Sequence, residues 1–463
     1  MRLHPVWSSR LPQWKRQVND LSGHPAPTSL TAGLVGLIRG KPVTAADLDA
    51  AALFTLDAVA NSLAGRNSEP GRVLMNWWQA RGASNAAPEP ARLAFLMGAL
   101  CHILETDDLH RESVVHPGCV VVPAAWALAG ARGATGRAFL EAVLQGFEAA
   151  TRVGMAVGPA HYRIWHNTAT CGPFGAAMAA ASLLGLSDDA AVHALGNSGS
   201  QSSGLWQFLE TGAMTKHLHA GHAAEAGVNA AELAAFGFTG PPQILEGEKG
   251  FFRAACPDAD PAAVLRKPDA PWQLVRTSIK PWPSCRHTHP TIDAAAELRA
   301  RLAADGIAAD AIEAVDVSTY AAAIDVCDRP VVQSDYEAKF SLQHTAAAAL
   351  LFPLVDFEAF GVAARDRCAP LAARVRVHAA DPWVSAYPAN WGGRVRVRLT
   401  NGMELAADRT DAKGDPEAPL SRDEMIEKAA MLLHHGGIEN PKPLIDAILG
   451  LAASAALPDL TLN

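Results

Sequence analysis

The first half of the chain shows the spacing of an amphipathic helix almost throughout. In residues 44–63, apolar side chains recur every three or four positions and form one stripe, which consists of Leu48, Ala52, Leu56, Val59 and Leu63. Residues 138–153 and 174–184 repeat this spacing, and either Thr28 or Ser29 is suited to cap the first helix. We therefore predict helices from about residue 28 to about residue 240.

The pattern changes after residues 257–271, a loop in which Asp, Pro and Ala cluster. Beyond this loop, β-branched residues alternate or concentrate in short segments, which predict strands at 272–280, 311–320, 373–379 and 393–400. Residues 401–403, with the sequence NGM, have the composition of a hairpin turn. Helical spacing returns in residues 291–302, 340–351 and 421–457, and we expect the last segment to pack against the first domain.

These patterns predict a mostly α protein, in which a large all-helical domain carries an inserted, smaller α+β domain. We expect an irregular N-terminal arm at residues 1–27 and a helical domain at 28–270, completed by residues 410–463. The α+β domain is expected at residues 271–409. A length of 463 residues agrees with two domains of this kind.

Composition and charge exclude several classes of protein. The formal net charge is −8 and no run of Lys or Arg occurs, so a nucleic-acid partner is not expected. The first 20 residues lack the apolar region of a signal peptide, and no segment has the length and hydropathy of a membrane span. The 7 cysteines are scattered without a CxxC pair, which is typical of reduced thiols. We expect a cytoplasmic protein with no membrane partner.

The densest group of chemically active side chains lies in the segment HILETDDLHRESVVHPG, residues 102–118. It contains His102, Glu105, Asp107, Asp108, His110 and His116. Carboxylates beside imidazoles can move protons near neutral pH, because each group shifts the pKa of the other. The same side chains are metal ligands, but their spacing matches no standard metal motif. A third interpretation is a helix end whose acids and histidines are solvated or cap backbone groups.

Three further polar clusters interrupt the Ala-rich chain. In HYRIWHNTATCGPFGAA, His166 is suited to proton transfer, although a lone histidine is more often structural. In GAMTKHLHAGHAAEAG, Lys216 and His219 begin a small-residue helix, and Lys216 could hold a carboxylate or remain an exposed lysine. In SIKPWPSCRHTHPTIDAA, Lys280 ends a predicted strand and Arg286 follows in a Pro-rich turn, where cations are placed to meet an anion.

These four stretches, in this order, resemble the MmgE/PrpD family from about residue 28 to the C-terminus. Members include 2-methylcitrate dehydratases, cis-aconitate decarboxylases and an iminodisuccinate epimerase. The resemblance implies the helical domain with a smaller α+β domain, a homodimer, and catalysis without a metal or an organic cofactor. Carried over motif by motif, it implies catalytic roles for Glu105, His116, His166, Lys216 and Lys280. It implies substrate-binding or supporting roles for Asp108, His110, His219, Arg286 and His289.

Two positions depart from the family pattern. Dehydratase and decarboxylase members generally carry Asp where this chain has Glu105, and Thr where it has Leu109. The acid is kept but displaced by one methylene, and one hydroxyl is lost. Because a hydrogen bond to a substrate group discriminates strongly, these changes indicate a substrate other than the family's best-known one.

The resulting functional hypothesis is a cofactor-free lyase, similar to 2-methylcitrate dehydratase, which moves a proton at carbon next to a carboxylate of a small polycarboxylate. Lys216, Lys280 and Arg286 would hold carboxylates, and His166 or His116 would be the acid or base, oriented by Glu105 or Asp108. The alternatives are an epimerase of an amino- or imino-polycarboxylate, a cis-aconitate-type decarboxylase, and a binding protein without activity.

Overall fold

The computed structural model describes residues 29–81 and 88–460, and the predicted arm at residues 1–27 lies outside them. The chain divides into two compact units. Within the described residues, the helical unit comprises 29–81, 88–103, 108–276 and 426–460, and the α+β unit comprises 104–107 and 277–425. Two segments interrupt the helical unit in the sequence: the four residues 104–107 and the long insertion 277–425. A mostly helical fold with a smaller α+β unit is confirmed.

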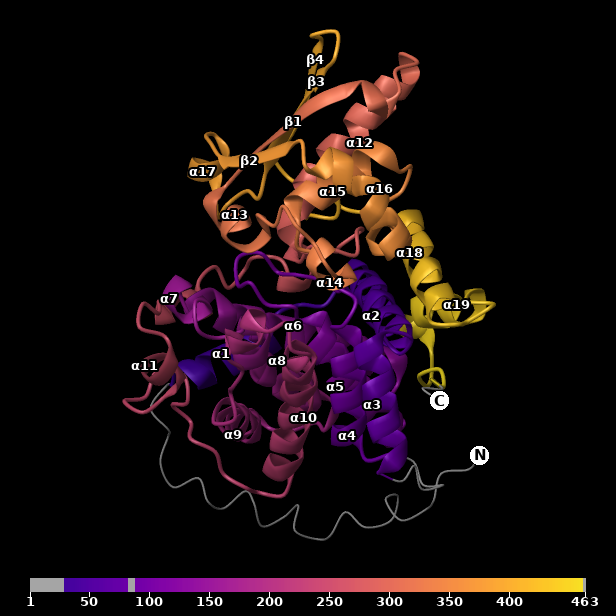
Figure 1. The fold of residues 1–463 in the computed structure, drawn as a ribbon. Helices are drawn as coiled ribbons and strands as arrows, with labels where there is room; N and C mark the ends of the chain where they lie inside the picture. Colours follow the sequence, from indigo (N-terminus) through magenta and orange to yellow (C-terminus); the bar gives the residue numbers. More distant parts are fainter. Residues whose placement is uncertain (1–28, 82–87, 461–463) are drawn as a thin grey trace. The chain divides into compact units, whose positions relative to one another are not determined.

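The helical unit consists mainly of helices, long and short, that follow one another through the first half of the chain, from the indigo end of the colour scale through magenta in Figure 1. They are α1 (Leu30–Gly40), α2 (Ala45–Gly65), α3 (Glu69–Ala80), α4 (Pro90–Cys101), α5 (Gly118–Arg132), α6 (Gly136–Ala156), α7 (Pro159–Tyr162), α8 (Asn167–Leu183), α9 (Asp188–Gly199), α10 (Thr215–Ala235) and α11 (Phe251–Ala255). The helices predicted at 44–63, 138–153 and 174–184 are confirmed as α2, α6 and α8.

Side-chain caps explain where several of these helices begin. The Ser29 hydroxyl accepts a hydrogen bond from the Ala32 amide at the start of α1. At the start of α2, Thr44 accepts from the Asp47 amide while the Asp47 carboxylate accepts from the Thr44 amide. These polar residues satisfy donors that the first helical turn leaves unpaired, so helix starts are encoded locally.

Small side chains allow the central helices to approach one another closely. A Cβ atom on Gly98 of α4 would lie 2.9 Å from the Cys119 carbonyl oxygen of α5 and 3.1 Å from the Ala220 carbonyl oxygen of α10. Further along α10, a Cβ atom on Gly227 would lie 2.3 Å from the Ala176 Cβ atom of α8. The high Ala and Gly content thus produces a core of tightly packed helices rather than one filled by aromatic rings.

The C-terminal helices α18 (Arg422–His435) and α19 (Lys442–Leu449) complete the helical unit. α19 packs on α2. The Lys428 ammonium group of α18 lies 2.5 Å from the Asp57 carboxylate of α2, and both side chains are buried. A buried ion pair of this kind is costly to break, because removing one partner leaves a desolvated charge.

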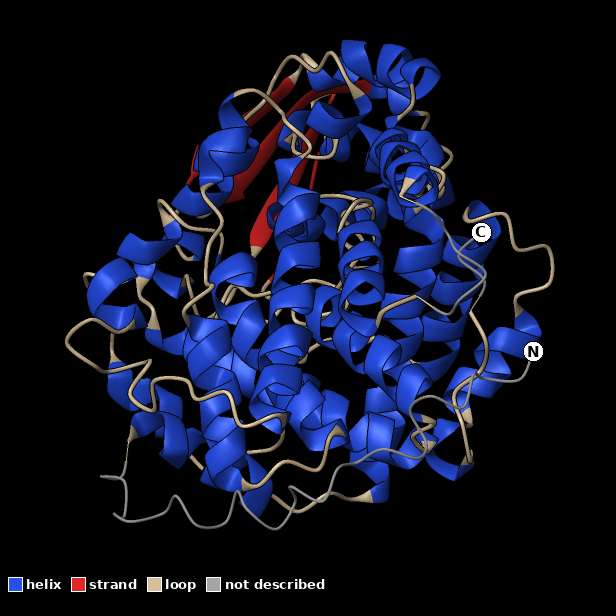
Figure 2. Cartoon of the chain, turned by 90° about the horizontal axis from the view of Figure 1, so that it is seen from below, coloured by secondary structure: helices blue, strands red, loops and turns tan. Residues whose placement is uncertain are grey.

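The α+β unit contains one four-stranded sheet, red in Figure 2, with the strand order β2-β1-β3-β4. β1 runs parallel to β2, whereas β1 and β3, and β3 and β4, are antiparallel. Its elements are α12 (His289–Ala304), β1 (Ile312–Thr319), α13 (Ala321–Cys327), α14 (Asp335–Ala338), α15 (Leu342–Leu351), α16 (Val362–Ala372), β2 (Val375–Ala379), α17 (Trp383–Ala386), β3 (Gly393–Leu399) and β4 (Glu404–Arg409).

Strict alternation along β3 separates a buried face from a charged one. Val395, Val397 and Leu399 are buried, whereas the intervening arginines are exposed and face acidic residues on the neighbouring strands. A hairpin joins β3 to β4, with Gly402 at a φ of 83° and a hydrogen bond of 2.8 Å from the Leu399 amide to the Met403 carbonyl. The strands predicted at 311–320, 373–379 and 393–400 and the NGM turn are confirmed.

The strand predicted at residues 272–280 is wrong. Residues 273–276 form a 3-10 turn, and no named strand follows before α12 in the described chain. The Glu148 carboxylate of α6 accepts a 2.8 Å hydrogen bond from the Gln273 amide, so this part of the segment takes its backbone partner from a helix side chain. Apolar and β-branched content favoured a strand locally, and tertiary contacts overrode that preference.

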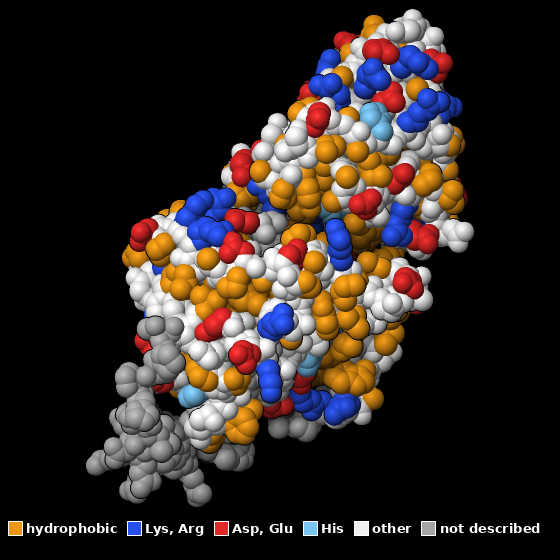
Figure 3. Space-filling view, turned by 90° about the vertical axis from the view of Figure 1, so that its left-hand side faces the viewer, with side chains coloured by type: hydrophobic (Ala, Val, Ile, Leu, Met, Phe, Trp, Pro, Cys, Tyr) orange, Lys and Arg blue, Asp and Glu red, His pale blue; other side chains and the backbone are white. Residues whose placement is uncertain are grey.

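Two surface properties bear on partners. Within the described residues, every helix is too short or too polar to cross a lipid bilayer. On the face drawn in Figure 3, Lys and Arg side chains are interspersed with Asp and Glu side chains over the described residues. This mixture matches the slightly acidic net charge of −8.

The close helix packing generates a stability prediction. Gly227→Ala should destabilise the protein by about 1–3 kcal/mol, because its new methyl group would collide with Ala176 Cβ and with the Ala177 amide nitrogen at 2.5 Å. Gly36→Ala on α1 is the matched control, because a Cβ atom there meets nothing within 4 Å, and it should be neutral or stabilising by up to about 1 kcal/mol. Urea unfolding followed by tryptophan fluorescence measures both. Equal midpoints for the two variants would contradict the packing argument.

Candidate active site

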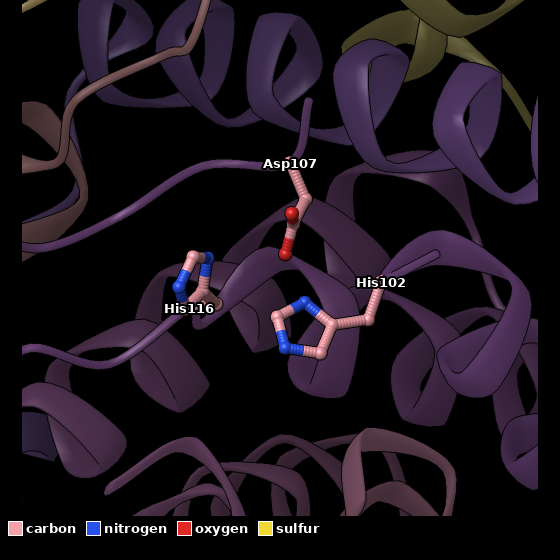
Figure 4. A group of neighbouring side chains, drawn as sticks. All are labelled: His102, Asp107 and His116. Atoms are coloured by element: carbon pink, nitrogen blue, oxygen red, sulfur yellow. The ribbon is translucent and has the colours of Figure 1, made fainter. Parts of the chain in front are cut away.

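Four histidine rings and one lysine gather in the helical unit, and we call them the imidazole cluster: His102, His116, His166, His219 and Lys216. The His102 and His116 rings meet edge to face with their centroids 4.7 Å apart, and the His102 and His166 rings are stacked at 5.5 Å. Figure 4 shows the His102 and His116 side chains turned toward one another, together with Asp107 of the same segment. Three of the four polar stretches thus supply one cluster.

Helix ends position these side chains. His102 caps the C-terminus of α4, and His166 stands at the N-cap position of α8. His116 lies just before α5, where its amide donates a 3.0 Å hydrogen bond to the Thr168 hydroxyl. Lys216 and His219 lie in the first turns of α10. Helix ends are rigid supports, so the cluster is held by well-packed elements.

His166 and His219 share a hydrogen bond between imidazole nitrogens. The two Nδ1 atoms are 3.2 Å apart, so one carries the proton and the other accepts it. His166 is 1% exposed, and its Nε2 atom has no hydrogen-bond partner among the described residues. The tautomer of the pair therefore decides whether His166 presents a lone pair or an N–H group at Nε2.

The loop before α10 holds this pair in place. The His166 amide donates a 2.9 Å hydrogen bond to the Gly204 carbonyl oxygen, and the Trp206 ring lies 4.6 Å from the His166 ring. Gly204 has a φ of 121°, and a Cβ atom there would lie 2.4 Å from Ala169 Cβ and 3.2 Å from His219 Nδ1. Glycine is therefore required at this position for both conformation and space.

Burial and like charges hold these imidazoles neutral. Burial lowers the pKa of His166 well below 6.5, and His102, Lys216, His219 and His116 lower it further by repulsion. Burial, with His102, His222 and Lys216, lowers the pKa of His219 to about 4. Protonation of either ring is thus unfavourable in the resting protein, and a proton gained there is readily given up.

A pocket of ≈ 660 Å³ opens beside the cluster within the helical unit. Its lining includes Trp165, Gly204, Phe208 and Leu218, and it reaches His219. A small molecule in this pocket would therefore touch His219, the member of the histidine pair that lines it.

The α+β unit holds a second group of predicted residues. The Lys280 ammonium group lies 3.5 Å from the Glu105 carboxylate and 3.6 Å from the Asp107 carboxylate, and all three side chains are at least 97% buried. Glu105 has a φ of 62°, a left-handed conformation that costs energy for a residue with a side chain. Buried charge compensation and local backbone strain are both common at functional sites.

Arg286 and His289 also lie in the α+β unit. The Arg286 guanidinium, 2% exposed, forms an ion pair with the buried Asp415 carboxylate, and its Nε and Nη1 atoms make no hydrogen bond to described residues. His289 is the first residue of α12, and its Nε2 atom lies 3.2 Å from the Ser284 carbonyl oxygen. Arg286 therefore retains donors that an anion could use.

Asp108 and His110 have structural partners in the helical unit. Both Asp108 carboxylate oxygens accept from the Gly118 amide, at 2.9 and 3.1 Å, where α5 begins. The His110 ring lies 2.9 Å from the Ser113 hydroxyl and 3.0 Å from the Gln273 side-chain oxygen. Their substrate-binding roles stay predictions, and the contacts account for both residues through backbone capping and loop anchoring. Leu109, where the resemblance implies Thr, is buried.

Family comparison explains why these motifs occur together. The MmgE/PrpD N-terminal domain matches residues 32–263, and the MmgE/PrpD C-terminal domain matches residues 282–443. The chain belongs to the MmgE/PrpD family. The resemblance inferred from the four motifs is therefore confirmed. The interval between the two family domains, residues 264–281, contains the point in the sequence where the chain passes from the helical unit to the α+β unit.

Two of the relatives described next are cis-aconitate decarboxylases, and the third is named for its likeness to that enzyme. Human cis-aconitate decarboxylase is 28% identical over 352 residues, which are 73% of this chain and 72% of the human protein. The cis-aconitate decarboxylase-like protein oryM of Aspergillus oryzae is 30% identical over 207 residues, or 41% of this chain and 43% of that protein. Mouse cis-aconitate decarboxylase is 30% identical over 273 residues, or 57% of this chain and 55% of the mouse protein.

Sequence reasoning assigned no role to several residues that shape the site. His102 was placed in the acidic cluster without a function, yet its ring stacks on His166. Trp206 and Phe208 cover His166 and His219, and Gln273 and Asp415 hold His110 and Arg286. Each of these contacts joins residues distant in the chain, so local spacing carries no signal for them.

The buried neutral histidines predict acid sensitivity. Burial lowers the pKa of His110 to about 4, so below pH 6.5 the unfolded chain binds a proton that the folded chain refuses. The free energy of unfolding therefore keeps its full value above pH 6.5 and decreases as the pH drops toward 4. His110 alone accounts for a decrease on the order of 3 kcal/mol. Urea midpoints at pH 7.5, 6 and 5 measure the loss. His110→Gln should flatten the dependence and the exposed control His434→Gln should retain it; identical slopes would refute the assignment.

Proposed function

We propose that this protein is a cofactor-free lyase that decarboxylates a small unsaturated polycarboxylate by acid/base chemistry at carbon next to a carboxylate. The observation that carries the proposal is the buried His166–His219 pair beside Lys216, in which His166 Nε2 has no hydrogen-bond partner among the described residues. Support for decarboxylation comes from relatives named cis-aconitate decarboxylase, one of which aligns with 73% of the chain.

The reaction needs a proton donor at carbon. Loss of CO₂ from an unsaturated tricarboxylate breaks one carbon–carboxylate bond and leaves its electron pair on the organic fragment. That pair forms a new double bond, and the former double bond becomes negative charge on the carbon beside a second carboxylate. Adding one proton to that carbon gives the dicarboxylate. Catalysis therefore requires stabilisation of the developing charge and a group that delivers the proton.

The histidine pair suits the delivery step. When the pair is protonated, His166 carries a proton on each ring nitrogen and shares the Nδ1 proton with His219. Transfer of the Nε2 proton to carbon then leaves a neutral, hydrogen-bonded pair, so no side chain has to move. Because the pKa of His166 is depressed, its protonated form is a strong donor. His219 lines the pocket, which gives the pair a path to regain a proton.

Lys216 supplies the electrostatic part of the proposal. It is 6% exposed, and its charge already lowers the pKa of His166 and His219. A cation in a water-poor site stabilises a carboxylate and the negative charge that develops beside it far better than in water. Binding an anionic substrate would also offset the repulsion between Lys216 and the protonated pair, which makes proton uptake easier once substrate is present.

The remaining predictions from the sequence are retained as parts of the proposal. Glu105, His116 and Lys280 keep catalytic roles, and Arg286 and His289 keep carboxylate-binding roles, each to be tested by its own variant. A homodimer, a cytoplasmic location and independence from metals belong to the same proposal. Dehydration, as in 2-methylcitrate dehydratase, and epimerisation remain alternatives, since the same groups could withdraw a proton instead of delivering one.

One experiment separates these reactions. The enzyme, dialysed against a chelator, is incubated with cis-aconitate and with hydroxy- and amino-polycarboxylates in deuterated water, and the products are read by NMR. Decarboxylation predicts a dicarboxylate with one carbon fewer and one deuterium beside a carboxylate. A new alkene without carbon loss would indicate a dehydratase, and label exchange at constant composition an epimerase. Turnover that disappears on dialysis and returns with a metal would overturn the cofactor-free proposal.

Substitution tests the assigned groups. His166→Ala and Lys216→Ala should each lower kcat by at least about a hundredfold, because they remove the proton carrier and the charge that stabilises the transition state. The surface substitutions His434→Ala and Lys249→Ala are matched controls and should leave kcat unchanged. Circular dichroism and urea midpoints establish that each variant is folded. Near-normal kcat in folded His166→Ala and Lys216→Ala would remove the imidazole cluster from the reaction.

A further inference from the structure

Two cysteine thiols meet in the α+β unit, at the turn that carries Arg286. Cys285 immediately precedes the 3-10 turn 286–288, and Cys327 is the last residue of α13. Helix α13 packs on this turn, and Cys285 packs against the apolar core to which Cys327 belongs. The Cys327 thiol donates a hydrogen bond to the Cys285 sulfur. The two sulfur atoms are therefore placed to be joined by a disulfide after a small movement.

Backbone hydrogen bonds hold Cys285 in this position. Its amide donates to the Lys339 carbonyl oxygen at 2.9 Å. Its carbonyl oxygen accepts from the Thr288 amide at 2.9 Å and from the Thr288 hydroxyl at 2.8 Å. Because both backbone groups are bonded, the turn keeps this sulfur beside Cys327.

The two thiols differ in acidity. The hydrogen bond from Cys327 lowers the pKa of the Cys285 thiol below its usual value of 9. Donation from the His287 amide and attraction to Lys280 lower this pKa further, whereas burial and the Glu105 charge oppose them. Burial and the bond to Cys285 raise the pKa of Cys327 well above 9. The pair thus contains one sulfur that is activated as a thiolate nucleophile and one that keeps its proton.

Exposure also distinguishes Cys285. It is partly exposed, whereas the other cysteines of the described chain are buried. Cys171 and Cys256 of the helical unit also lie close enough to interact, but burial raises the pKa of Cys171 to about 12 and that of Cys256 above its usual range. Contact between thiols is therefore not sufficient for reactivity. The Cys285–Cys327 pair adds access and activation to contact, as cysteines that sense oxidants do.

We propose that Cys285 and Cys327 form a reversible redox site, in which a peroxide oxidises Cys285 and Cys327 then closes a disulfide with it. The disulfide would tie the turn that carries Arg286 to the end of α13. This site is independent of the proposed lyase activity.

Two steps account for the atoms and electrons. The Cys285 thiolate attacks one peroxide oxygen, the O–O bond breaks, and the departing oxygen takes a proton from solvent, which leaves a sulfenic acid on Cys285. The Cys327 sulfur then attacks the Cys285 sulfur, and the Cys327 proton leaves with the hydroxyl group as water. Each sulfur has given one electron to the peroxide. A dithiol returns both electrons and two protons, which restores the thiols.

Peptide mapping tests the proposal on the full chain. The reduced protein is treated with hydrogen peroxide, alkylated and digested without reductant. Mass spectrometry should find the Cys285 peptide joined to the Cys327 peptide, and a dithiol should release both. A link between Cys171 and Cys256 should be absent. Cys285 should be oxidised at least about tenfold faster than Cys368, which is buried in the same core as Cys327.

Serine variants test the order of the two steps. Cys327→Ser removes the thiol that closes the disulfide, so Cys285 should stop at the sulfenic acid, which a 1,3-dicarbonyl probe traps. Cys285→Ser removes the activated sulfur, so Cys327 should stay reduced. Cys368→Ser is the matched control from the same core and should leave the Cys285–Cys327 disulfide unchanged. Circular dichroism establishes that each variant is folded, and the map of the unsubstituted protein decides the question if one is not.

Three results would overturn the proposal. They are oxidation of Cys285 no faster than that of Cys368, complete oxidation of Cys285 without a link to Cys327, and a disulfide between Cys285 residues of two molecules. No substrate enters these measurements, so failure of the proposed lyase activity and failure of the redox site are observed separately.

Discussion

Close packing of helices through small residues is the constraint on which the rest of this structure depends. The helices α4, α5, α8 and α10 lie so close together that backbone atoms of one helix occupy the space where a larger side chain of its neighbour would stand. Only an interior rich in Ala and Gly allows this approach. Their ends then converge and bury several imidazoles and one lysine together. Burial and mutual repulsion depress the pKa values of His166 and His219, and this converts ordinary histidines into strong proton donors when charged.

Both units also bury ion pairs. In the helical unit Lys428 faces Asp57, and in the α+β unit Lys280 faces Glu105 and Asp107 while Arg286 faces Asp415. Such pairs contribute little net stability, but removing one partner leaves an uncompensated charge that is severely destabilising. They are therefore better understood as a means of holding cations in defined places than as a source of folding energy.

The departures from the family pattern and the apolar pocket point in one direction. A buried Leu109 replaces a hydroxyl of the pattern, and the space beside His219 is walled by aromatic and aliphatic side chains. Neither Leu109 nor the apolar side chains of this pocket can offer a hydrogen bond. In a shared scaffold, the walls around a site can change which compound is bound while the reaction type is kept.

The sequence by itself determined the helical periods of α2, α6 and α8, the caps at Ser29 and Thr44, the alternation of β3 and the NGM turn, because each depends on neighbours within a few residues. It also named the motifs that carry His166, Lys216 and Lys280. Tertiary structure alone decided that residues 272–280 are not a strand, that His102 stacks on His166, and that His219 bonds His166 beside a large pocket. These contacts join residues separated by up to 125 positions, and local spacing contains no information about such pairings.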